Sequence, residues 1–192
     1  MDSIVDGLMK QMMSSDNLTT IGQKVGADDK STKSALEMGL PLLLGALSQK
    51  ASTSEGSNSI LSSIAGIAQG AGNPADDVSA YLGSSSSSQG SDLVSSLLGS
   101  SMQPIQQAVS QRTGLPANVV GQLLSMALPL LLGSLGQKSS PSPESNDLSK
   151  MLAEQSNLAM SSSPGAAEVM QQLIAPEKSG GIMGMLKKIL KM

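Results

Sequence analysis

Residues 40–50 read LPLLLGALSQK, and residues 128–138 read LPLLLGSLGQK. The likeness extends upstream without a gap, so that residues 21–50 align with residues 109–138 at a constant offset of 88. Thirteen of these thirty positions are identical in the two segments. The sequence therefore predicts an internal duplication, in which one helix-turn-helix unit occurs twice and supplies the centre of the fold.

Each copy of this motif carries a proline inside an apolar stretch of helical periodicity. A proline in a helix interior removes one backbone hydrogen bond and costs about 3 kcal/mol, yet both copies contain it. A glycine follows four residues later and would allow a neighbouring backbone to approach closely. We therefore predict two long helices that are kinked at their prolines and packed through their leucines. The core motif comprises Leu40, Pro41, Leu43, Gly45, Leu128, Pro129, Leu131 and Gly133.

The composition favours an all-α fold. Tyr81 is the only aromatic residue among the 192, so the core must be built from Leu, Met, Ile, Val and Ala. Most of these residues are good helix formers, and the aromatic residues typical of sandwiches and barrels are missing. The length suits one domain or two small ones. We expect an all-α array of helices that contains the duplicated unit and the two proline-kinked long helices.

Turn-forming residues divide the chain into regions. Ser-rich stretches mark two linkers, and a Pro and a Gly-Gly pair precede the last segment. The predicted division is a first helical repeat region at 1–83, a Ser-rich linker at 84–90, a second helical repeat region at 91–138, a linker at 139–146, C-terminal helices at 147–175 and a basic amphipathic tail at 176–192.

Local signals predict where individual helices begin and end. We expect Asp16 to cap a short helix that stops at Gly26, and Asp28 or Asp29 to start the long helix that ends near residue 50. Asn73 and Pro74 are expected to open a further short helix. The remaining helices are predicted at 3–13, 55–69, 91–99, 104–113, 116–138, 147–159 and 164–174, with Leu148, Met151, Leu152, Leu158, Val169, Met170, Leu173 and Ile174 buried in the last two.

Residues with common catalytic roles are scarce. The chain has no His and no Cys, which excludes histidine general bases, thiol chemistry and disulfides. The pairs Asp28-Asp29 and Asp76-Asp77 stand at predicted helix starts, where carboxylates act as caps. The thirteen Met residues recur at helical spacing and are expected to fill core gaps rather than to bind a soft metal. We predict no enzyme activity, no cofactor, no metal site and no small-molecule substrate.

Charge is distributed unevenly along the chain. Residues 1–177 hold 8 basic and 15 acidic side chains, whereas residues 178–192 hold four Lys and no acid. On a helical wheel the apolar residues of 182–192 share one half and the lysines occupy the other. Such a segment is too short to be a stable free helix, so its apolar face needs a partner. The candidate interaction residues are Ile182, Met185, Leu186, Lys187, Lys188, Ile189, Leu190 and Lys191. Three partners stay open: the acidic body, another protein or subunit, and an anionic membrane surface.

Two other functions deserve comparison with protein binding. The helix-turn-helix outline of residues 104–138 suggests nucleic-acid binding, but its second helix carries no charge before Lys138, whereas phosphate contacts need Lys or Arg.

Residues 119–135 are apolar over 17 positions, at the lower limit for crossing a bilayer, and contain Gln122 and Pro129. We expect a buried core helix there. The N-terminus does not resemble a signal peptide.

Several separated motifs resemble one family. They are IGQKVGADDKSTKSALEMGLPLLLGALSQKAS at 21–52, EGSNSIL at 55–61, GSDLVSSLLGS at 90–100 and VSQRTGLPANVVGQLLSMALPLLLGSLGQ at 109–137. Together they resemble the YidB-like family of bacterial proteins, which bear the domain of unknown function nine-three-seven. The resemblance covers residues 18–138 and implies a compact array of short helices, with no assigned catalytic residues. Many members close with an Asp-Gly-Asp-Gly segment, which this chain lacks, so no calcium-like loop is implied.

The sequence thus predicts a non-enzymatic helical protein that acts as an interaction, scaffold or self-associating module. The alternatives are nucleic-acid binding through the helix-turn-helix pair and peripheral membrane association through the tail. We expect a protein partner or self-association, and at most weak contact with a membrane surface. The expected location is the cytoplasm, with peripheral attachment to the membrane as the alternative.

Overall fold

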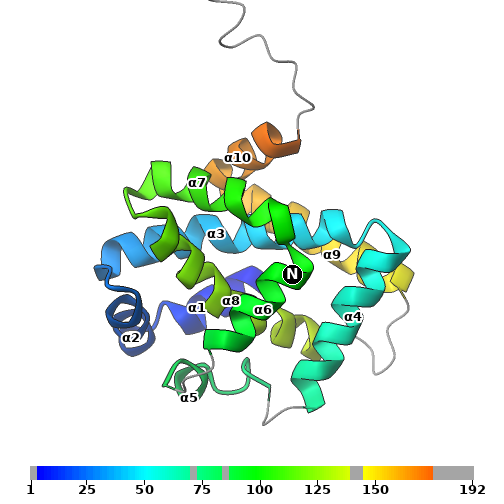
Figure 1. Ribbon diagram of the computed structural model, residues 1–192, viewed down its shortest axis with the longest axis horizontal. Coiled ribbons are helices and arrows are strands. Elements are labelled where there is room, and N and C mark those ends of the chain that lie inside the picture. The colour runs from blue at the N-terminus through cyan, green and yellow to red at the C-terminus, as the bar shows by residue number, and fades with distance from the viewer. Residues whose placement is uncertain (1–3, 70–72, 84–86, 139–144, 175–192) are drawn as a thin grey trace, which may run out of the picture.

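A computed structural model describes residues 4–69, 73–83, 87–138 and 145–174. Within these ranges the chain forms ten α-helices and one short 3-10 helix, and no strand, so the predicted all-α class is confirmed (Figure 1). The elements are α1 (Ile4–Met12), α2 (Ser15–Val25), α3 (Asp29–Lys50), α4 (Ser54–Gln69), α5 (Val78–Gly83), α6 (Ser87–Leu97), η1 (Gly99–Ser101), α7 (Met102–Thr113), α8 (Ala117–Lys138), α9 (Ser145–Ser162) and α10 (Pro164–Ile174).

Two long helices of equal length, α3 and α8, each contain 22 residues. Their bounds differ by the same offset of 88 that relates the two sequence copies. The preceding helices, α2 and α7, both end at a left-handed glycine, Gly26 at φ 72° and Gly114 at φ 75°. Glycine adopts this conformation without the steric cost of a Cβ atom. The sequence repeat therefore corresponds to two helix-turn-helix units with matching ends, while the duplication that would explain them stays a prediction.

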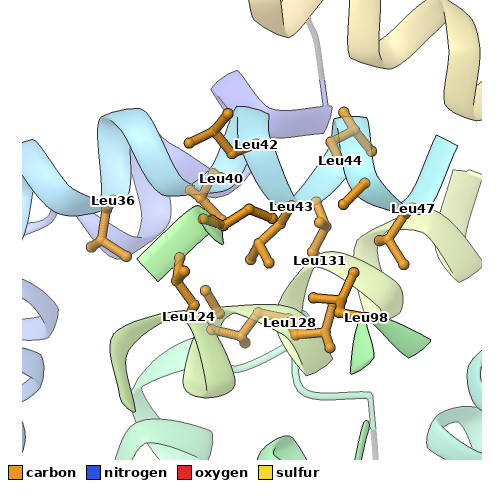
Figure 2. Close-up of a cluster of buried hydrophobic side chains, with 14 of the residues drawn as sticks. Leu36, Leu40, Leu42, Leu43, Leu44, Leu47, Leu98, Leu124, Leu128 and Leu131 are labelled. Atoms are coloured by element: carbon orange, nitrogen blue, oxygen red, sulfur yellow. The ribbon is translucent and has the colours of Figure 1, made fainter. Parts of the chain in front are cut away.

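The leucines of the two long helices pack against one another at the centre of the molecule. Leu43 on α3 faces Leu128 and Leu131 on α8, and all three side chains are fully buried (Figure 2). Leu42 and Leu44 point from the opposite side of α3 and are buried as well. Helices α1, α2, α4, α6 and α7 also contact α8, so it lies in the middle of the fold (Figure 1).

Helices α9 and α10 lie along α3, and α9 also contacts α1 and α4. Their buried side chains include Leu148, Leu152, Val169 and Met170, as predicted, and Met151 is partly buried. The prediction of a buried Leu158 is wrong: this side chain is 40% exposed, because no described element covers that side of α9. The side chains of Leu173 and Ile174 lie outside the described part of the structure.

Both long helices continue through their prolines. Pro41 lies inside α3 and Pro129 inside α8, and neither helix is interrupted there. The other residues of the core motif are buried on the same two helices. The bend that we expect at each proline stays a prediction.

Three local expectations are wrong. Asp16 lies inside the first turn of α2, and Ser14 precedes the helix instead. Pro74 belongs to a turn in which Asn73 Oδ1 accepts from the Ala75 N–H, and α5 begins only at Val78. Residues 87–90, which the composition assigns to the Ser-rich linker, form the first turn of α6, because packing on α8 outweighs their loop-like composition.

Candidate functional site

Each internal proline leaves one backbone carbonyl without its helical donor, because the residue four positions earlier finds no N–H. For Pro41 this is the Glu37 carbonyl, and the hydroxyl of Ser163 donates to it at 3.3 Å from the α9–α10 turn. For Pro129 it is the Ser125 carbonyl. A Cβ atom on Gly90 would overlap the Ser125 carbonyl oxygen, so the α6 backbone crosses directly over it. Each of the two carbonyls is therefore covered by a different segment of the chain.

The glycines that follow the prolines are also approached closely. A side chain at Gly45 would collide with the ends of Met160 and Met170 from the α9–α10 pair. At Gly133 it would collide with Asn73, whose Nδ2 donates to the Gly133 carbonyl at 3.0 Å. In both copies the missing Cβ atom makes room for a neighbouring segment. The atoms that occupy this space belong to side chains, and not to a neighbouring backbone as the sequence suggested.

The paired carboxylates serve the ends of helices and loops. Asp28 Oδ1 accepts from the Ser31 N–H at 2.9 Å and caps α3, and Asp77 Oδ1 accepts from the Ala80 N–H at 2.9 Å and caps α5. Their neighbours face elsewhere: Asp29 accepts from the Thr19 hydroxyl, and Asp76 accepts from Gln137 Nε2. Each pair therefore divides its two members between different partners.

Two titratable groups depart from their ordinary behaviour. The backbone N–H of Ser31 holds the pKa of Asp28 below its usual value, and burial raises the pKa of Tyr81. In the ranges that the structure describes, no three carboxylates gather into a group that would hold a metal ion. Both shifts follow from ordinary local structure, a helix cap and a half-buried phenol.

The α7–α8 pair does not present a reader helix. A helix that enters a nucleic-acid groove must expose its side chains, and α8 is buried along most of its length. The basic residue at the end of α7, Arg112, is 2.6 Å from Glu168 on α10, so an acid already neighbours its charge. On α3, Lys33 lies 3.8 Å from Glu37.

Helix α8 is the one described helix that is long and apolar enough to cross a membrane. Of its most apolar 18-residue window, 72% is buried inside the protein. Core helices of soluble proteins share this length and composition, so the feature is weak evidence for a membrane span.

The candidate tail residues, Ile182 to Lys191, lie outside the described residues. Sequence reasoning missed the groups that cover the two long helices, namely Ser163, Gly90 and Asn73. The sequence indicates Asn73 as the start of a short helix and Gly90 as the end of a linker and the first residue of a family motif, and Ser163 carries no signal. No local pattern relates them to their partners, because Asn73 is 60 residues from Gly133 and Ser163 is 126 residues from Glu37.

The fold defines a class of protein: an all-α body centred on two buried, proline-containing helices that follow left-handed glycines. Residues 7–138 match the family described as bacterial protein of unknown function (DUF937), and the chain belongs to that family. This agrees with the resemblance inferred from the separated motifs. No curated protein and no solved structure gives a significant match.

Proposed function

We propose that this protein is a non-enzymatic helical interaction module, which binds a protein partner or a second copy of itself through its basic amphipathic tail. The observation that carries the proposal is the charge contrast along the chain. Four Lys and no acid stand in residues 178–192, after 177 residues that hold 15 acidic and 8 basic side chains. A cytoplasmic location belongs to the same proposal.

The burial of apolar side chains in the folded body supports the tail as the binding segment. The leucines of the two motif copies are fully buried, so the most apolar stretches of the chain contribute to the core and not to a binding surface. Among the described residues, Leu158 is the one large hydrophobic side chain with substantial exposure. The tail is therefore the strongest apolar candidate for binding a partner.

Charge reversal in the tail tests the proposal. We expect the full-length protein to exceed 19.5 kDa by size exclusion with light scattering at about 100 μM, where a micromolar association is nearly complete. Lys187→Glu, Lys188→Glu and Lys191→Glu together should lower the measured mass relative to the wild type at the same concentration. The matched control carries Lys10→Glu, Lys30→Glu and Lys150→Glu, the same change in net charge on the exposed body, and should still associate.

A wild-type chain that stays at 19.5 kDa and binds no defined protein partner would contradict the proposal. Equal loss of association in the tail variant and the control would contradict the role of the tail, because net charge alone would then explain the effect.

Membrane association through the same tail is the second candidate, favoured by the separation of lysines from apolar residues. Three lysines contribute about 3 kcal/mol near an anionic surface, which supports reversible binding at most. Co-sedimentation with vesicles that contain an anionic phospholipid, but not with neutral vesicles, would support this role. Failure of the full-length protein to sediment with anionic vesicles would exclude it.

A further inference from the structure

The two long helices are covered at matching positions by different parts of the chain. On α8, Gly90 covers the Ser125 carbonyl and Asn73 covers Gly133. Both covering residues lie within residues 7–138, the part that matches the family. The family region thus closes the surface of α8 with its own elements.

On α3 the matching positions are covered from outside the family region. Ser163 donates to the Glu37 carbonyl, and the ends of Met160 and Met170 lie over Gly45. All three belong to the α9–α10 hairpin, residues 145–174, which follows the family match. The family region therefore has on α3 a surface shaped for a helical segment that it does not itself supply. We call this surface, from the Glu37 carbonyl through Gly45 to Ala51, the acceptor face.

The start of the hairpin is held at the far end of the acceptor face. The hydroxyls of Ser57 on α4 and Ser149 on α9 both donate to the Ala51 carbonyl, and the two hydroxyl oxygens are 3.0 Å apart. Ser57 is almost fully buried. This contact joins the hairpin to the family region at a defined pair of atoms.

Further contacts hold the rest of the hairpin. Gln155 Oε1 accepts from the Ile4 N–H at 2.8 Å, and Arg112 lies 2.6 Å from Glu168. The chain joins α8 to α9 through residues 139–144, SSPSPE, which contain no side chain suited to a core. The hairpin is thus held on the body by non-covalent contacts. The hairpin of a second copy has the same side chains and can form the same contacts.

We propose that the acceptor face also binds the α9–α10 hairpin of a second copy of this chain, so that two molecules exchange hairpins reciprocally. Such an exchange makes a dimer at low cost, because the incoming hairpin forms the same hydrogen bonds and apolar packing as the hairpin that it replaces. The inference goes beyond the proposed function, since it uses residues 145–174 and does not depend on the tail.

Single-cysteine variants of the full chain test the exchange, because the chain has no Cys of its own. Ser57→Cys and Ser149→Cys replace two oxygens 3.0 Å apart, close enough for a disulfide to form with little movement. The two variants are mixed in equal amounts at high concentration and oxidised. We expect a disulfide-linked dimer of one chain of each kind as the main product, with the bond mapped to positions 57 and 149.

Two controls make the result decisive. Ser62→Cys places the thiol on the exposed side of α4, so its mixture with Ser149→Cys measures random collision. The double variant Ser57→Cys/Ser149→Cys in one chain should form an intrachain disulfide, which shows that the fold and the contact are intact. The exchange is wrong if the intrachain bond forms but the mixed single variants give no more dimer than the control pair. Absence of the intrachain bond would contradict the contact on which the inference rests.

The outcome is independent of the proposed function. Loss of tail association with retained 57–149 cross-linking would leave the exchange standing and remove the tail from it. The reverse result would reject the exchange and leave the tail as the binding segment.

Discussion

Glycines in the helices of this protein differ in their surroundings, although the sequence shows them as the same residue. Gly66 on α4 is exposed, and a Cβ atom added there meets nothing within 4 Å. Gly90 on α6 is buried against the backbone of Ser125. The first glycine only weakens its helix, whereas the second is required for packing.

Substitution by alanine should therefore have opposite effects at the two positions. Gly66→Ala should stabilise the protein by about 0.5–1 kcal/mol through helix propensity. Gly90→Ala should destabilise it by roughly 1–3 kcal/mol, because a backbone carbonyl cannot move aside as a flexible side chain does. Urea unfolding of both variants measures the difference. A stabilised Gly90→Ala variant would show that α6 does not cross the Ser125 carbonyl.

Burial likewise separates the leucines. Leu43→Ala and Leu131→Ala should each lower the free energy of unfolding by roughly 2–5 kcal/mol, because both side chains are fully buried. Leu158→Ala should cost less than about 1 kcal/mol, since that side chain is 40% exposed. Chemical denaturation of the three variants tests the ranking. Equal costs at all three positions would contradict the packing of α3 against α8.

At the scale of the element, local chemistry marks the ends of the long helices. Asp28 caps α3 through the Ser31 N–H, and left-handed glycines end the helices that precede α3 and α8. The interiors of α3 and α8 depend on other segments, because each contains a proline whose missing N–H leaves a carbonyl to be covered from outside.

The Asp28 cap should make stability depend on pH. The pKa of Asp28 lies below 3.8 in the folded state, so the fold favours the carboxylate. This contribution is complete above 3.8 and is lost as the pH falls through the folded pKa. Asp28→Ala should therefore lower the melting temperature at pH 7, and its difference from the wild type should shrink in strong acid.

The control for this cap is Asp28→Asn, which keeps an accepting oxygen but cannot titrate. The melting temperature of this variant should fall less between pH 7 and pH 2 than that of the wild type, because residue 28 then takes up no proton. A gap between the wild type and Asp28→Ala that stays constant from pH 7 to pH 2 would contradict the cap.

At the scale of the whole molecule, the position of α8 decides which surfaces are available. The helix that would read a nucleic acid lies at the centre of the fold, in contact with α3, α4 and α6 among others. The body around it carries more acidic than basic side chains. Both features oppose binding to a polyanion.

We therefore predict no gel shift of duplex DNA by the full-length protein, even at about 50 mM salt, where phosphate contacts are strong. A shift that weakens as salt is added would contradict this prediction. In that case Lys30→Glu/Lys33→Glu would show whether the exposed start of α3 is responsible.

Much of the architecture was predictable because its signals are local. The offset of 88, the apolar periodicity and the glycines at 26 and 114 located the two long helices and their ends. Predictions failed where packing overrides composition: Ser-rich residues 87–90 form helix on α8, and Leu158 remains exposed despite its apolar side chain. For the tail, the sequence alone supports the amphipathic pattern.

By itself, the sequence determined the all-α class, the repeated unit and the family, because each depends on residue types and on motifs whose order can be read directly along the chain. Only the tertiary structure decided which segments cover α3 and α8. Ser163 reaches Glu37 across 126 residues, and Asn73 reaches Gly133 across 60. Contacts of that range arise from the packing of whole helices, and a free carbonyl or a bare glycine does not specify which segment will meet it.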